Sequence, residues 1–231
     1  MKKISLVIML SVFVITLVSA ESESWMSLGF ESGHFFEHGS DDTNTIDSYM
    51  NSPGIAYGGY TFWNNKNVGL FIHDSFLFPT KLSTTINGTT TNADLSVYDL
   101  MMQVGIIVGP GFRYNISEQM KIHSGLGLSF LETVATYSQY DYYYGNISYS
   151  MLAFNFGVGG DIGMKYDITD SFYLDLGTII NYAFKNYTSI KSSFGSASAW
   201  SNSEYRMISL RPYLCLGLNF YKSNEGLGKK K

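Results

Sequence analysis

LAFNFGVGGDIGMKY, residues 152–166, shows most plainly how this chain folds, because its side chains alternate in kind. The even-numbered positions are apolar or aromatic apart from one glycine. The odd-numbered positions hold only small residues and the polar Asn155, Asp161 and Lys165. Successive side chains of a β-strand point to opposite faces, so this period of two predicts one long strand with an apolar face and a small or polar face.

The same parity recurs in the neighbouring segments 98–113, 172–183 and 208–220, where the even-numbered residues are again the apolar set. Strands are expected at roughly 24–33, 54–63, 67–78, 96–114, 119–137, 148–166, 171–186 and 204–221. Short turns are expected at 64–66, 115–118 and 167–170, and long polar loops at 34–53, 79–95, 138–147 and 187–203. Short turns that alternate strictly with long loops are typical of an all-β, eight-stranded antiparallel up-and-down barrel that spans a membrane.

The N-terminus has the layout of a cleaved secretory signal. Lys2 and Lys3 precede an apolar run, 4–18, and small residues end the segment at Ala20. We expect a signal peptide at 1–20, an outer-membrane barrel at 21–221 and a basic periplasmic tail at 222–231. Removal of the leader makes the net charge about −6, since nineteen acidic residues stay and two lysines leave.

The composition excludes several classes of protein. Charged residues make up 15% of the chain, and no clustered basic surface is present that would favour nucleic-acid binding. The single cysteine, Cys215, rules out an internal disulfide framework. No apolar stretch after Ala20 is long enough for a membrane-spanning helix, so a membrane crossing would have to use strands.

The alternation alone fits both a membrane barrel and a soluble, lipocalin-like barrel, which would turn the apolar set inward. A soluble barrel would then expose the odd-numbered set, which has too few charges for a water-facing surface. Aromatic residues also flank the apolar band as an interface girdle would. Those at the short-turn rim are Phe112, Tyr114, Tyr166, Phe172 and Phe220, and those towards the other rim are Tyr98, Phe130, Tyr182 and Phe184. We therefore expect even-numbered side chains to meet lipid and odd-numbered ones to fill the centre.

The chain resembles the small eight-stranded bacterial outer-membrane barrels of the OmpX, OmpA-domain and OmpW kind, over its whole mature length. The resemblance rests on the leader, the strand number, the loop asymmetry and the last strand, 210–220, whose apolar residues alternate up to a final aromatic. In that family the aromatic is usually the last residue, whereas here 221–231 follow. The resemblance implies a monomer in the bacterial outer membrane, with membrane lipids and the barrel-insertion machinery as partners.

The odd-numbered set predicts a polar and ionic network in the lumen. Its members are Asp99, Arg113, Asn155, Asp161, Lys165, Asp175, Asn181 and Arg211. Eight strands enclose a space that side chains can fill, and charges of both signs at close quarters favour a plugged centre. A narrow gated pore, or a carrier for small or apolar molecules, is the alternative.

The long loops are the expected binding surface of a non-enzymatic protein with no cofactor. Tyrosine offers a large contact area at low entropic cost, which suits adhesion to a host or envelope ligand. The candidates are Tyr137, Tyr140, Tyr142, Tyr143, Tyr144 and Trp200. His34 and His38 match an H-x-x-E-H zinc pattern, but no helix is expected there, so they are a weak metal candidate. An outer-membrane lipid-modifying enzyme is a remote alternative.

Overall fold

A computed structural model describes residues 22–40, 44–63, 66–201 and 204–221. The expected signal peptide, 1–20, and the expected tail, 222–231, lie outside these residues and stay predictions. Most of the described chain is β-strand. The described part contains no helix that is both long and apolar enough to cross a membrane.

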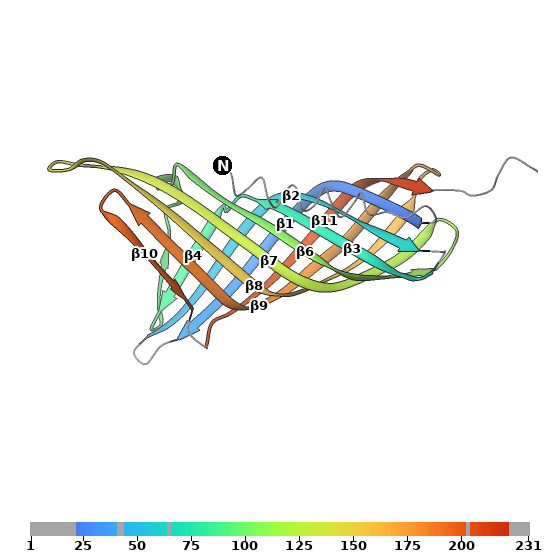
Figure 1. The fold of residues 1–231 in the computed structure, drawn as a ribbon, viewed down its shortest axis with the longest axis horizontal. Coiled ribbons are helices and arrows are strands. Elements are labelled where there is room, and N and C mark those ends of the chain that lie inside the picture. The colour runs from blue at the N-terminus through green and yellow to red at the C-terminus, as the bar shows by residue number, and fades with distance from the viewer. Residues whose placement is uncertain (1–21, 41–43, 64–65, 202–203, 222–231) are drawn as a thin grey trace, which may run out of the picture.

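The described strands form a closed antiparallel ring of eight (Figure 1). In chain order the members are β1 (Ser22–Ser40), β2 (Thr45–Trp63), β3 (Val68–Leu77), β6 (Leu100–Asn115), β7 (Met120–Asp141), β8 (Gly145–Asp167), β9 (Phe172–Ser192) and β11 (Arg206–Tyr221). Each pairs with the next along the chain, and β1 also pairs with β11 from Glu23 opposite Tyr221 to His38 opposite Arg206. This closure leaves the ring without a free edge, which is the condition for strands to cross a bilayer. The predicted eight-stranded barrel is confirmed.

The two rims differ, as expected, but the long segments are not the loops that the sequence suggested. The ring strands continue beyond the barrel, so that β7 and β8 form one hairpin up to Asp141 and Gly145. A hairpin of β4 (Lys81–Ile86) and β5 (Thr89–Asn92), followed by the short helix η1 (Leu95–Val97), extends the wall next to β2. Likewise β10 (Gly195–Trp200) pairs with β9. Figure 1 shows these hairpins projecting from one end, opposite the short turns.

Odd-numbered side chains point into the barrel on the ring strands apart from β2, where the prediction is wrong, and the end of β9. Beyond the register shift at Phe156 and Gly157, Asn186 lies opposite the inward-facing Asn155, so even-numbered residues of β9 face inward there. Inward-facing Trp25 of β1 lies directly opposite Tyr60 of β2, and directly paired residues share a face. Accordingly Ala56, Tyr60 and Phe62 are buried, whereas Ile55 is 44% exposed. The sequence of β2 concealed this parity because both of its faces carry glycine and aromatic residues.

The interior is filled by two clusters of apolar side chains. The larger lies towards the short-turn rim and contains Trp25, Ala56, Tyr60, Phe62, Phe71, Ile107, Tyr173, Ile179, Tyr213 and Cys215. The smaller lies towards the hairpin rim and contains Phe35, Met50, Leu77, Leu131, Ala183 and Met207. Aromatic rings of the paired strands β1 and β2 meet in this interior; the centroids of Trp25 and Phe62 are 4.9 Å apart.

The outer wall is apolar instead of charged. Large exposed side chains on it include Leu28, Phe30, Leu126, Ile162, Leu176 and Leu216. The aromatics expected at the short-turn rim, Phe112, Tyr114, Tyr166, Phe172 and Phe220, are all exposed on this wall. Such a surface would be costly in water and suits contact with hydrocarbon bounded by an aromatic girdle.

Candidate functional site

Polar side chains occupy the lumen in three linked layers. In the middle of the barrel, Arg211 donates from Nη1 to Ser75 Oγ at 2.6 Å and lies 3.0 Å from Glu31 Oε1. The other carboxylate oxygen of Glu31 accepts from Ser75 Oγ at 2.9 Å and lies 2.9 Å from His73 Nε2. All four side chains are buried, so this layer is a compact ionic plug that joins β1, β3 and β11.

The second layer surrounds His123, which lies between two carboxylates. Its Nε2 is 2.8 Å from Asp175 Oδ1 and its Nδ1 is 3.1 Å from Asp161 Oδ2. Asp161 also accepts hydrogen bonds from the hydroxyls of Tyr60 and Tyr213, the latter at 2.9 Å. Because buried charges are stable only when paired and hydrogen-bonded, this arrangement explains how two carboxylates are held inside the barrel.

The third layer lies near the short-turn rim. Glu23 binds Arg113, and its second oxygen is 3.3 Å from Lys121 Nζ. Asp167 binds Lys165 and is 3.3 Å from the same Lys121 nitrogen. Lys165 Nζ also lies 5.0 Å from the centre of the Trp25 ring. Cations, carboxylates and an aromatic face thus fill the end of the lumen nearest the short turns.

Seven of the eight residues predicted for the lumen network are buried, and Asp99 is not. The buried residues are Arg113, Asn155, Asp161, Lys165, Asp175, Asn181 and Arg211. Asn181 donates to Ser209 Oγ at 3.1 Å, and Asn155 accepts from Asn186 and from the Tyr205 hydroxyl. The placement of Asp99 in the lumen is wrong, because β6 begins one residue later and the chain at Asp99 is still exposed above the barrel.

The predicted set left out several partners of this network. They are Glu23, Glu31, His73, His123 and Asp167. All five have odd numbers on strands with inward odd positions, so the alternation would have identified them if it had been extended to β1, β3 and both ends of β7 and β8.

The predicted loop aromatics lie on two hairpins, most of them near the β7–β8 tip and Trp200 at the base of the β9–β10 hairpin. Tyr142 and Tyr143, at the tip of the β7–β8 hairpin, are 85% and 86% exposed. Tyr140, Tyr144 and Trp200 are exposed as well, and the ring of Trp200 lies 5.1 Å from that of Tyr187. Tyr137 is different, since it is only partly exposed and stacks on Tyr149 with the ring centres 4.5 Å apart. The hairpin tips therefore present aromatic side chains to the surroundings of the barrel.

The H-x-x-E-H pattern at 34–38 lies on the extended strand β1. Because side chains of a strand alternate between its two faces, Glu37 points away from the two histidines. His34 and His38 face the outer wall, whereas Glu37 is at an inward position beside the Tyr205 hydroxyl. His34 Nδ1 lies 3.1 Å from the Tyr49 hydroxyl, and His38 is ion-paired with Asp47. Among the described residues, His, Cys, Asp and Glu form no group of three that could hold a metal ion.

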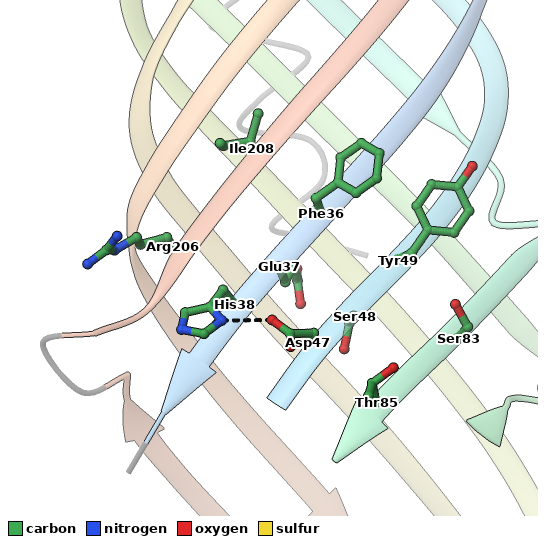
Figure 2. A pocket seen from close by; sticks show the side chains of 10 residues that line it. All are labelled: Phe36, Glu37, His38, Asp47, Ser48, Tyr49, Ser83, Thr85, Arg206 and Ile208. Carbon is green, nitrogen blue, oxygen red and sulfur yellow. Dashed lines mark hydrogen bonds and ion pairs between the residues drawn. The ribbon is translucent and has the colours of Figure 1, made fainter. Parts of the chain in front are cut away.

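Two hollows interrupt the outer wall near the hairpin rim. The first, of about 510 Å³, lies over β1, β2, β4 and β11 and is lined on β1 by Phe36, Glu37 and His38 (Figure 2). The second, of about 700 Å³, lies over β7, β8 and β9. Its lining residues are Phe130, Phe154, Asn155, Phe156, Phe184, Lys185, Tyr187 and Trp200. It coincides with a break in the β8–β9 register at Phe156 and Gly157, where a β-bulge disturbs the wall.

Comparison with known proteins identifies the fold. No protein-family model matches the chain. No curated protein sequence matches it either. Among solved structures, the outer membrane protein OprG from Pseudomonas aeruginosa is similar with a TM-score of 0.57 and 9% identity, over 87% of this chain and 97% of that chain. The outer membrane protein AlkL in lipid bilayers has a TM-score of 0.54 and 13% identity, over 90% and 94%. The attachment invasion locus protein Ail of Yersinia pestis follows with 0.47 and 14%, over 87% and 99%.

These identities are low, so the likeness concerns the path of the chain and not its chemistry. It covers nearly the full length of this barrel and of each similar structure. It also agrees with the closed ring, the apolar wall and the two unequal rims. The chain has the fold of the small eight-stranded outer-membrane β-barrels.

Proposed function

We propose that this protein is a non-enzymatic surface protein of the bacterial outer membrane whose lumen is plugged and whose hairpins bind ligands outside the cell. The exposed apolar wall and its aromatic girdle support the membrane location. The filled lumen is the observation that argues against a pore. Trp25 and Lys165 are fully buried in it and Arg211 is 1% exposed, so large side chains occupy the place of a water column.

The tyrosines of the β7–β8 hairpin support a binding role for the outer end. Tyr142 and Tyr143 project from a two-stranded support and are exposed. Exposed aromatic side chains on a rigid scaffold offer contact area without a large loss of side-chain entropy on binding. The partner on this proposal is a host or envelope molecule, and the barrel itself serves as an anchor.

Conductance across planar lipid bilayers tests the plugged lumen. The purified, refolded protein should give no discrete current steps at neutral pH, while a known porin in the same bilayers gives them. Heat-modifiable mobility on gels should show that the inserted sample is folded. Reproducible unitary steps from folded protein would refute the plug and favour the gated pore.

A carrier for small apolar molecules is the second candidate, and the hollow at the β8–β9 bulge favours it. Aromatic rings line this hollow, and the inward-facing residue Asn155 is among its lining residues, beside the register shift. Uptake of a fluorescent apolar dye into proteoliposomes tests this candidate. Uptake that Phe156→Trp abolishes would favour the carrier over the anchor.

A further inference from the structure

The hollow in Figure 2 changes in chemistry along the barrel axis. Phe36, Tyr49 and Ile208 line the part towards the middle of the barrel, and the rings of Phe36 and Tyr49 are 5.1 Å apart. His38 and Arg206 lie towards the end of the strands. One side of the hollow is therefore apolar and the other is charged, in an order that matches a bilayer from its core to its surface.

The position of the hollow agrees with this order. Phe220 belongs to the aromatic girdle at the short-turn rim, and Ile208 lies on the same strand towards the other rim. A rise of ~3.3 Å per residue and a tilt of ~40° place Ile208 about 30 Å above Phe220. The apolar band of such barrels is about 25 Å tall, so Ile208 lies at the outer interface and Arg206 just beyond it.

The charged part of the hollow offers both a cation and hydrogen-bond acceptors. Arg206 is exposed at the rim, and guanidinium groups bind phosphate oxygens through two parallel hydrogen bonds. On the other side of the hollow lie Asp47, which is held 2.7 Å from His38 Nδ1, and the Ser83 hydroxyl. The Thr85 hydroxyl also lies there, 2.8 Å from that of Thr90. A carboxylate would repel a simple anionic headgroup but accepts hydrogen bonds from the hydroxyls of a sugar.

We propose that this hollow binds a phosphorylated glycolipid of the outer leaflet, an inference that rests on the proposed outer-membrane location. Phe36 and Ile208 contact its acyl chains. The sugar lies beside Tyr49, whose ring has Lys81 Nζ 5.8 Å from its centre. The hydroxyls of the sugar bind Asp47 and Ser83, and its phosphate binds Arg206. The volume of about 510 Å³ lies within the range of small-molecule sites, about 300–1,000 Å³.

Binding of lipid A to the refolded barrel in detergent, measured by native mass spectrometry, tests the proposal. Arg206→Gln should lower the affinity about tenfold, because it removes a charge-assisted hydrogen bond, and Arg206→Lys should recover part of it. Lys191→Gln is the matched control, since Lys191 is an exposed cation on β9 beyond the same rim and lines neither hollow. This control should bind lipid A like the unmodified protein.

Further arms identify the ligand chemistry. Ser83→Ala should weaken binding of lipid A without changing that of phosphatidylglycerol, and dephosphorylated lipid A should be insensitive to Arg206→Gln. Equal losses in Arg206→Gln and Lys191→Gln, or tighter binding of phosphatidylglycerol than of lipid A, would overturn the proposal. Displacement of lipid A by inorganic phosphate at the same concentration as lipid A would overturn it as well.

The same samples separate this inference from the proposed function. Heat-modifiable mobility and insertion into bilayers are measured for every variant. A protein that never inserts refutes the outer-membrane location itself. A protein that inserts but binds lipid A without regard to Arg206 refutes only the glycolipid site.

Discussion

Replacing Arg211 by methionine should strongly destabilise the barrel. Arg211 is 1% exposed and interacts with Glu31 at 3.0 Å and with Ser75 at 2.6 Å. The substitution leaves the Glu31 carboxylate buried with His73 and Ser75 as its remaining partners. Removing one member of a buried ion pair costs about 3–5 kcal/mol of the free energy of unfolding, because the other charge stays buried.

Urea-induced unfolding in phospholipid vesicles, followed by tryptophan fluorescence, measures this cost. Arg206→Met is the matched control on the same strand, where an exposed arginine should contribute less than about 0.5 kcal/mol. The double variant Arg211→Met with Glu31→Leu should lose much less stability than the sum of the two single variants, with a coupling of about 1.5 kcal/mol or more. An Arg211→Met variant as stable as Arg206→Met, or additive single effects, would refute the ionic plug.

Two further changes test the packing and the hairpin tip. At Gly217 an added Cβ would lie 2.1 Å from the Tyr173 ring, so Gly217→Ala should lower the free energy of unfolding by about 1–3 kcal/mol in the same urea assay. Gly39→Ala is the control, because nothing lies within 4 Å of an added Cβ there, and it should leave the midpoint nearly unchanged. Equal midpoints for both would contradict the crowded lumen. Replacing Tyr142 and Tyr143 together by serine should leave unfolding and heat-modifiable mobility unchanged but reduce adhesion of protein-displaying cells to host cells; undiminished adhesion would exclude the tip as the binding surface.

The alternation of residues predicted the barrel because a strand between lipid and a filled lumen needs two chemically different faces. In 152–166 every large apolar residue falls on one parity, and the structure places that set on the outer wall. The strand β2 could not be predicted in this way. Its inward residues Tyr60 and Phe62 are as apolar as its outward residues Ile55 and Tyr57, so only pairing with β1 fixes its parity.

The hairpins beyond the barrel were also beyond sequence reasoning. Segment 81–92 is rich in threonine and serine on both faces, since water surrounds it, and so it lacks the apolar stripe that marks a strand. The error at Asp99 also reflects a lack of contrast, because β6 begins with Leu100, Met101 and Met102, which are apolar on both faces and do not show where the strand starts. The ionic partners Glu31 and His123 were predictable from parity, but their distances depend on the register of distant strands.

Nitroxide labels on β2 test the central claim, that one set of side chains meets lipid while the other fills the lumen. Single cysteines at Ile55, Ala56 and Tyr57, in a protein with Cys215→Ser, are labelled and reconstituted into bilayers, and their collision rates with oxygen and with a water-soluble nickel complex are compared. Labels at Ile55 and Tyr57 should collide mainly with oxygen, which concentrates in hydrocarbon, and the label at Ala56 should be shielded from both. Free collision of oxygen at Ala56, with shielded labels at Ile55 and Tyr57, would mean that the barrel is inside out at this strand and would contradict the account.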